Sequence, residues 1–247
     1  MPRRPNYLPD KARAEDFSRR LRRWFRRNSR DLPWRRTRDP YRVLVSELML
    51  QQTQVSRVVD FYGKFLKRFP TIHELAAAPP KRVMESWEGL GYYARARNLH
   101  KLAKQVTADG GNGALSSVPS ELQKLPGIGA YTAGAVASFA HEKRAALVDT
   151  NVARVLSRVF APKLNPKRPA DLKKLWTVAE EVLPRTGAVT WTHNQAVMEL
   201  GALICTARIK HCTSCPLAST CLSYDTGTAP GFRSTSPRQQ LRRSANY

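Results

Sequence analysis

Glu47 is the residue whose setting most strongly suggests chemistry. It lies in a nearly continuous apolar run, residues 43–55, that ends in three glutamines. On a helix, Glu47 shares a face with Val43, Leu44 and Gln51, so its side chain is expected to point toward packed apolar surface. Burial raises the pKa of a carboxyl group, and a carboxyl that stays protonated near neutral pH can deliver a proton to a leaving group. The alternative is an ordinary helix glutamate that reaches solvent or pairs with an arginine.

Asp149 is the second acid in an unusual position. It ends a short apolar run, residues 145–148, and precedes a helical pattern that places Val152 and Val155 on the buried side. Position alone predicts a helix N-cap. The same position favours a functional carboxylate facing Glu47 across a cleft, because the N–H groups at a helix N-terminus would support its negative charge. The two interpretations are compatible.

The chain has four cysteines, and all of them lie close together near its end with the spacing C-x6-C-x2-C-x5-C. They are Cys205, Cys212, Cys215 and Cys221. This clustering argues against disulfides distributed over the fold and predicts a four-thiolate metal site. Zinc and an iron–sulfur cluster both accept four thiolates, and the spacing does not separate them.

The segment Leu125-Pro126-Gly127-Ile128-Gly129 predicts a sharp turn between two helices. We expect one helix to end at Leu125 and the next to begin near Tyr131, because the two glycines let the backbone reverse direction. Main-chain N–H groups at the start of the second helix can hold a phosphate oxygen without reading a base. The alternative is a turn that only joins two packed helices.

The charge of the chain indicates a polyanionic partner. It contains 42 Lys and Arg against 19 Asp and Glu, a net charge of +23. Nucleic acid is the first expectation, because phosphate contacts supply most of the non-specific affinity for basic proteins. No apolar stretch approaches the ~18 residues of a membrane span, and the N-terminus lacks the apolar core of a secretion signal. We therefore expect a cytoplasmic, nucleoid-associated protein, or a nuclear one in a eukaryote.

The elements that must position these groups are predicted to be almost entirely helical. Sustained period-two alternation is absent from the sequence. Helical patterns cover 14–28, the segment opened by Asp39-Pro40 that carries Glu47, 57–68, 72–77, 80–88, 94–108 and two stretches within 171–204, while 109–120 is predicted to be a surface loop.

Three motifs together resemble the adenine DNA glycosylases, A/G mismatch repair enzymes of the helix-hairpin-helix superfamily that includes endonuclease III. They are Ser46-Glu47-Leu48-Met49-Leu50-Gln51-Gln52-Thr53-Gln54-Val55, Gly89-Leu90-Gly91-Tyr92-Tyr93-Ala94-Arg95-Ala96-Arg97-Asn98, and the 6-2-5 cysteine spacing. The resemblance covers residues 15–221. It implies an all-α, two-domain fold with an iron–sulfur cluster loop, a four-iron four-sulfur cofactor, and hydrolysis of the N-glycosidic bond of an adenine flipped out of mismatched double-stranded DNA.

The resemblance also implies roles for individual residues. Glu47 is expected to protonate the adenine, Asp149 to stabilise the oxocarbenium-like sugar, and Tyr131 and Asn151 to bond around these acids. Tyr131 stands where lyase members carry a Schiff-base lysine, so efficient strand cleavage is not expected. The expected DNA contacts are Gln52, Tyr92, Leu125, Gly127, Gly129 and Thr132, and the expected base pocket is Leu32, Trp34, Arg35 and Gln195. Core packing is the alternative for Trp34 and Tyr92, and simple solvent exposure for Gln52.

The expected domain plan follows from the same resemblance. Residues 1–14 form a flexible basic arm, 15–36 a helix that packs with the cluster domain, 37–147 a six-helix barrel with the hairpin, 148–221 the cluster domain, and 222–247 a disordered basic tail. The tail is too short for the C-terminal domain that reads 8-oxoguanine in most family members. We expect a monomer.

Two alternatives remain open at this level. Mismatch thymine or uracil glycosylases of the same superfamily also lack that domain and keep the glutamate, tyrosine and aspartate. Gln51-Gln52-Thr53-Gln54 and Gly91-Tyr92-Tyr93-Ala94-Arg95 favour adenine. A non-catalytic iron–sulfur module that binds DNA is the other alternative, and the intact acids Glu47 and Asp149 argue against it.

Overall fold

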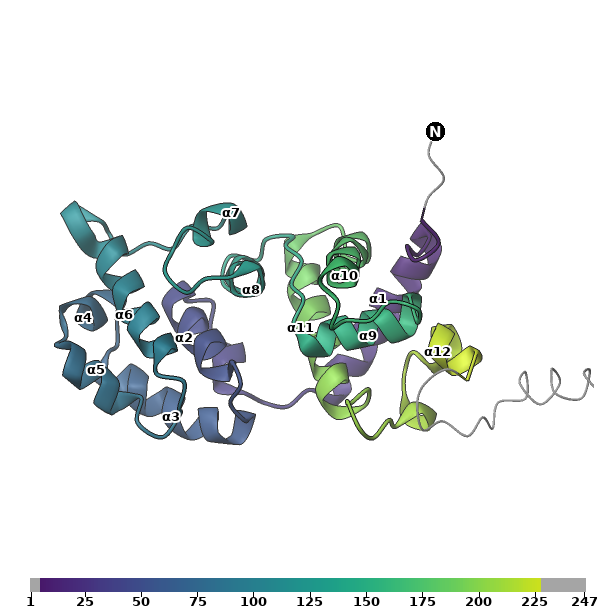
Figure 1. The fold of residues 1–247 in the computed structure, drawn as a ribbon, viewed down its shortest axis with the longest axis horizontal. Helices are drawn as coiled ribbons and strands as arrows, with labels where there is room; N and C mark the ends of the chain where they lie inside the picture. The colour runs from purple at the N-terminus through teal and green to yellow at the C-terminus, as the bar shows by residue number, and fades with distance from the viewer. Residues whose placement is uncertain (1–4, 228–247) are drawn as a thin grey trace, which may run out of the picture. The chain divides into compact units, whose positions relative to one another are not determined.

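The computed structural model describes residues 5–227 and consists of two compact units. Unit 1 contains Met1–Ser29 and Arg144–Tyr247, and unit 2 contains Arg30–Lys143. Figure 1 shows each unit as a group of helices. Residues 5–227 contain no strand, although Cys205 and Lys210 form an isolated bridge. The prediction of an all-α fold is therefore confirmed.

Unit 2 is organised around the apolar helix α2. This helix packs against α3, α6 and α8 and against the short 3-10 helix η1. Its residues from Val43 to Met49 are all buried. The bounds in this unit are η1 (Pro33–Arg36), α2 (Pro40–Leu50), α3 (Val55–Arg68), α4 (Ile72–Ala77), α5 (Pro80–Ser86), α6 (Ala94–Thr107), η2 (Ala108–Gly110), α7 (Pro119–Leu122) and α8 (Ala130–Phe139).

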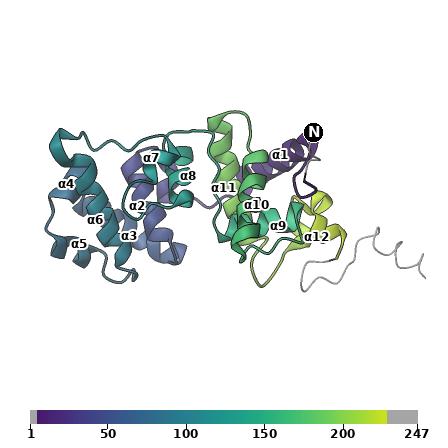
Figure 2. The same ribbon diagram turned by 45° about the horizontal axis from the view of Figure 1, so that its top comes forward.

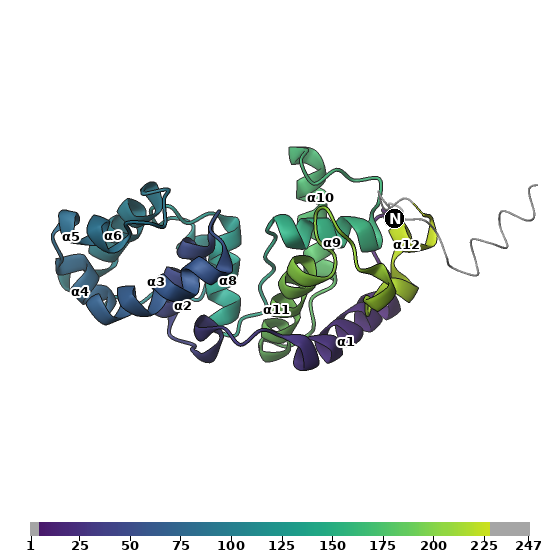
Figure 3. The same ribbon diagram turned by 90° about the horizontal axis from the view of Figure 1, so that it is seen from below.

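Unit 1 brings the first helix of the chain together with its last third. Helix α11 packs against α1 and α9, and α9 packs against α10 and α12. Figures 2 and 3 show α1 beside the green helices that follow α8 in the chain. The bounds are α1 (Lys11–Asn28), α9 (Thr150–Phe160), α10 (Pro169–Glu181), α11 (Gly187–Leu203), η3 (Cys212–Ser214), η4 (Ala218–Thr220) and α12 (Leu222–Asp225).

Side-chain caps explain where several helices start. Asp10, Asp39 and Asp149 each accept a hydrogen bond from the backbone N–H three residues later, at the first turns of α1, α2 and α9. Each cap satisfies one of the N–H groups that a helix start leaves without an intrahelical partner. Pro40 also occupies the first position of α2, where its missing N–H costs nothing.

Three predicted boundaries were wrong. Helix α1 begins at Lys11, so residues 11–14 are helical and do not belong to a flexible arm, because Asp10 caps the helix earlier than the apolar pattern indicated. Helix α7 ends at Leu122, before Leu125. Helix α12, Leu222–Asp225, occupies the start of the expected tail. Residues 1–4 and 228–247 of the expected arm and tail lie outside the described residues.

The unit boundaries fall at 29/30 and 143/144. The expected domain boundaries, 36/37 and 147/148, lie further along the chain. The first differs because the segment 30–36 groups with α2 in unit 2. None of the helices between residues 5 and 227 is long and apolar enough to cross a membrane.

Candidate active site

Glu47 is buried in the middle of α2. The residue is only 3% exposed and is surrounded on its helix by Leu44 and Leu48, which are buried as well. The hydroxyl of Tyr131, the second residue of α8, donates a hydrogen bond of 2.7 Å to Glu47 Oε2. A carboxyl group in apolar surroundings with a hydroxyl donor beside it is an arrangement that can hold and release a proton. The expected burial of Glu47 is therefore confirmed, and the alternative that its side chain reaches solvent is wrong.

The turn before α8 has the backbone that the sequence predicted. Gly127 is left-handed at φ 76°, and a Cβ there would lie 2.6 Å from Cβ of Asn98, so both its conformation and its surroundings require glycine. Gly129 is the N-cap of α8. The side chain of Thr132 is buried and accepts a 3.3 Å hydrogen bond from Gln51. Thr132 can therefore offer DNA only its main-chain N–H group, whereas Leu125 is half-buried at the turn.

Gln52 and Tyr92 are both exposed and both have positive φ angles, 56° and 46°. Tyr92 is 60% exposed, so the alternative that it packs in the core is wrong. Non-glycine residues adopt this left-handed conformation only at some cost, and such residues concentrate at functional sites.

Asp149 lies at the start of α9 in unit 1. Its carboxylate accepts hydrogen bonds from the Val152 N–H (2.6 Å) and from the Asn151 side chain (3.2 Å). The N-cap prediction is confirmed. Burial raises the pKa of Asp149, and these donors together with the charge of Arg154 lower it in part without cancelling the effect of burial. Glu47 and Asp149 belong to different units, so their pairing across a cleft stays a prediction.

Arg154 joins the Asp149 end of α9 to the cysteine loop, and the sequence did not predict this. Its Nη2 donates to Asn151 Oδ1 and to the Gly201 carbonyl, each at 2.7 Å, and its Nε donates to the Cys205 carbonyl at 2.8 Å. A Cβ at Gly201 would lie 2.7 Å from Cβ of Asn151, so glycine lets α11 approach α9 closely. The arginine therefore holds Asn151 in place with partners on three segments.

The residues predicted for the base pocket are mostly buried. Leu32 and Trp34 are 7% and 6% exposed, and the Trp34 ring meets Tyr62 edge to face at 5.6 Å. Arg35 donates to the Arg30 carbonyl at 2.8 Å. These three predicted residues lie in unit 2, and buried Gln195 lies on α11 in unit 1. Trp34 packs as a core residue would, so its role in a pocket stays a prediction.

The four cysteines line one small pocket between α9 and the loops around η3 and η4. Nη1 of Arg158 donates a hydrogen bond of 3.2 Å to Cys205 Sγ. Burial raises the pKa of Cys215 to about 12 and that of Cys221 to about 11. Among residues 5–227, no three histidine, cysteine or acidic side chains are grouped as a metal ion requires. All four thiols nevertheless line the same pocket, and the ligand that they would share is taken up below.

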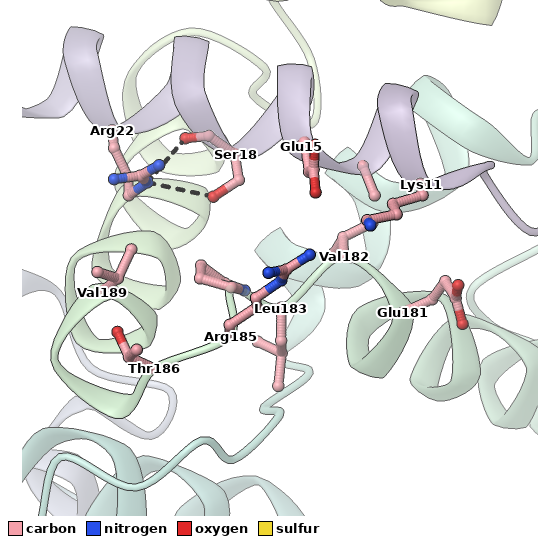
Figure 4. Close-up of a pocket in the computed structure, with 12 residues that line it drawn as sticks. Lys11, Glu15, Ser18, Arg22, Glu181, Val182, Leu183, Arg185, Thr186 and Val189 are labelled. Carbon is pink, nitrogen blue, oxygen red and sulfur yellow. Dashed lines mark hydrogen bonds between the residues drawn. The ribbon is translucent and has the colours of Figure 1, made fainter.

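A different pocket, of about 380 Å³, opens between α1 and the segment that joins α10 to α11. Figure 4 shows Arg22 above it, with Nε donating to the main-chain oxygen and the hydroxyl of Ser18, both at 3.2 Å. Lys11 and Arg185 line this pocket together with Glu15. It contains none of the residues predicted to act on DNA.

Comparison with known proteins gives consistent matches. The model of the HhH-GPD superfamily of base excision DNA repair proteins matches residues 45–181. The chain is 44% identical to adenine DNA glycosylase of Buchnera aphidicola, over 78% of this chain and 54% of that protein. It is 38% identical to thymine-DNA glycosylase of Aeropyrum pernix, over 87% and 97% respectively.

The solved structure of a thermostable thymine-DNA glycosylase superimposes with a TM-score of 0.78 at 31% identity, over 87% of this chain and 98% of that one. The chain spans about half the length of the adenine DNA glycosylases that it matches.

Proposed function

Because this chain belongs to the HhH-GPD superfamily of base excision DNA repair proteins, we propose that it is a DNA glycosylase that removes adenine mispaired with guanine or 8-oxoguanine. The observation that carries the proposal is the buried carboxyl group of Glu47 with the Tyr131 hydroxyl 2.7 Å away. The similarity to adenine DNA glycosylases, 44% in one relative, favours adenine as the base.

The mechanism needs two carboxyl groups in different protonation states. Glu47 gives a proton to the base, which then leaves as a neutral group when the C1′–N9 bond breaks. Asp149 remains ionised beside the positively charged sugar, and water adds to C1′ with the loss of one proton, which restores the protonated Glu47. The hydrogen bonds that Asp149 accepts from Val152 and Asn151 oppose the effect of burial on the pKa of Asp149. The developing positive charge of the sugar favours the ionised form further. The base must leave the duplex first, since its glycosidic bond is inaccessible in the stack.

The four cysteines are the proposed ligands of a four-iron four-sulfur cluster. Their convergence on one pocket and the Arg158 contact to Cys205 support this assignment. A bound cluster would hold the loop from Cys205 to Cys221 together, since four thiolates would share one inorganic core. Broad absorbance near ~400 nm in the purified protein would support iron, whereas a colourless protein with bound zinc would contradict it.

A thymine or uracil glycosylase is the second candidate. The thymine-DNA glycosylase of Aeropyrum pernix shares 38% identity with the chain along nearly its whole length, and a thymine-DNA glycosylase structure superimposes well. The same fold and the same pair of acids would serve either base.

Single-turnover base release from four duplexes separates the candidates. The duplexes contain A opposite 8-oxoguanine, A opposite G, T opposite G and U opposite G, and Glu47→Gln is assayed beside the wild type. We expect adenine release that falls at least about 100-fold in Glu47→Gln. Release of thymine or uracil instead would show that the protein is a mismatch thymine or uracil glycosylase. DNA binding with no base release from any duplex would indicate a binding module.

A further inference from the structure

Arg95 is a buried cation at the start of α6. It is 7% exposed, and its side chain bonds to oxygen atoms at the C-terminal end of α2, in the loop that follows α2 and in the loop before α6. Burying a guanidinium is costly unless its donors are satisfied, and Arg95 satisfies them almost entirely with main-chain carbonyls. Arg95 lies on the same face of α6 as Leu99 and Leu102, so the sequence itself shows an arginine on an apolar face.

The first loop follows the end of α2. Nη1 of Arg95 donates to the carbonyls of Leu48 and Met49, both at 2.8 Å, and to the carbonyl of Gln51. Nη2 donates to Thr53 Oγ1 at 3.1 Å. The carbonyls at a helix C-terminus lack intrahelical partners and carry partial negative charge, so a cation stabilises them. Arg95 thus contacts the residues on both sides of Gln52, through the Gln51 carbonyl and the Thr53 hydroxyl.

The second loop precedes α6. Nη2 donates to the carbonyls of Leu90 (3.1 Å) and Gly91 (3.0 Å), and Nε donates to the carbonyl of Tyr92 (3.4 Å). The guanidinium also lies 5.5 Å from the centre of the Tyr92 ring. The same side chain therefore holds the backbone beside Tyr92 as well.

The two loops share one unusual property. Gln52 and Tyr92 are exposed, non-glycine residues with positive φ angles. Such a conformation persists only where surrounding contacts enforce it. The planar, branched guanidinium of Arg95 is the group that contacts the backbone beside both of them, and it ties their conformations together.

We propose that Arg95 is a positioning residue that sets Gln52 and Tyr92 in one fixed arrangement before DNA arrives, so that both side chains enter the base stack together. The inference deepens the proposed function and rests on it, since the resemblance to the adenine DNA glycosylases implies that both side chains contact DNA. Residues ordered in advance lose less freedom on binding, so more of the contact energy remains available for opening the stack.

The conservative variant Arg95→Lys tests this arrangement. Lysine keeps the charge, but a single ammonium group cannot reach both loops with a planar set of donors. Arg97→Lys is the matched control, because Arg97 is exposed and lies one half-turn further on the same helix. Thr53→Val replaces the hydroxyl, which accepts from Arg95 and donates to the Gln51 carbonyl at 3.4 Å, with a methyl group, and provides a milder variant in case Arg95→Lys does not fold.

The measurement uses a duplex that contains A opposite G, with 2-aminopurine placed beside the target adenine. The fluorescence of 2-aminopurine rises when the neighbouring bases unstack from it. Each variant is studied at saturating protein, so that differences in affinity do not contribute, and single-turnover base release is followed on the same duplex. For Arg95→Lys we expect both the fluorescence rise and the rate of base release to fall about tenfold. Thr53→Val should show a smaller loss of both, and Arg97→Lys should match the wild type.

A full fluorescence rise in Arg95→Lys and Thr53→Val would overturn the proposal, even with lowered thermal stability, because the arginine would then serve folding alone. The absence of a fluorescence rise in the wild type would overturn it too. A wild-type fluorescence rise without base release would count against the proposed function, and the fluorescence of the variants would still decide the role of Arg95.

Discussion

At the scale of single residues, Asp149 combines two opposing requirements. It caps α9, and it is the proposed partner of the charged sugar, yet burial raises its pKa. Because its pKa is higher in the folded than in the unfolded protein, the free energy of unfolding decreases as the pH rises through that interval. At neutral pH the ionised carboxylate therefore reduces stability, which is the usual cost of a charge placed for catalysis.

The variant Asp149→Asn should separate stability from function. Asparagine is as good an N-cap as aspartate and carries no charge, so we expect a melting temperature at pH 7 equal to or above that of the wild type. Base release should fall by about 100-fold or more. Differential scanning fluorimetry and single-turnover kinetics measure the two effects. Asp39→Asn, at the exposed cap of α2, is the control that should leave base release unchanged. A clear loss of stability in Asp149→Asn would contradict the account.

His193 predicts a pH dependence of folding. Burial beside Arg22 lowers its pKa to about 3, and its Nδ1 lies 3.0 Å from Ser18 Oγ. A lowered pKa means that the neutral ring stabilises the fold fully above the ordinary histidine pKa, and that this contribution is lost progressively as the pH falls toward 3.

From pH 7 to pH 5, the wild type should lose about 2 kcal/mol more of its free energy of unfolding than His193→Gln loses. Urea titrations at both pH values measure the difference. His73→Gln, which changes an exposed histidine, should keep the wild-type dependence. Equal losses for wild type and His193→Gln would show that the ring binds its proton as readily in the folded as in the unfolded protein, which contradicts the lowered pKa.

At the scale of elements, the contact between α9 and α11 determines the geometry around Asp149. Gly201 on α11 lets the two helices approach, and Arg154 then reaches both the Gly201 carbonyl and the Asn151 side chain. Since Asn151 donates to Asp149, a change in the spacing of these helices alters the carboxylate that is proposed to face the sugar.

The substitution Gly201→Ala should therefore reduce both stability and activity. The added Cβ would lie 2.7 Å from Asn151 Cβ, and we expect a loss of about 1–3 kcal/mol in the free energy of unfolding, because packed helices shift at that cost. Gly63→Ala is the matched control on α3, where nothing lies within 4 Å of the new Cβ. It should stabilise by about 0.5–1 kcal/mol through helix propensity. Urea unfolding of both variants measures the contrast, and a gain in both would refute the packing argument.

At the scale of the whole molecule, the positive net charge is the property that we expect to determine affinity for DNA. A net charge of +23 exceeds what solubility requires, and the exposed arginines on α1 supply part of it in unit 1. Neutralising DNA phosphates releases counterions, so affinity should fall steeply as salt increases.

Fluorescence anisotropy with a mismatched duplex should show affinity falling by about 10³-fold or more between 50 and 200 mM salt, as for proteins that neutralise six or more phosphates. Tyr92→Ala should weaken binding without changing the slope, because tyrosine carries no charge. A salt-independent affinity would mean that the positive charge does not meet phosphate.

Much of this protein could be predicted from its sequence because the responsible signals are local. Apolar periodicity predicted the helices, Asp39-Pro40 predicted the start of α2, and an acid inside an apolar run predicted the burial of Glu47. Gly127 and Gly129 predicted a turn before α8, and the left-handed backbone of Gly127 confirms it. Each of these depends on residues within about two helical turns of one another, a range over which side-chain spacing determines which face is buried.

The tertiary structure alone decided which distant groups meet. It placed Arg95 between two loops and Arg154 between α9, α11 and the cysteine loop, whereas the family resemblance already implied that Tyr131 bonds around the acids. The two arginines bond largely to main-chain carbonyls, and every residue has a carbonyl, so the sequence contains no sign of which ones a buried guanidinium will select. That selection arises only when the packing of helices brings particular chain ends within reach.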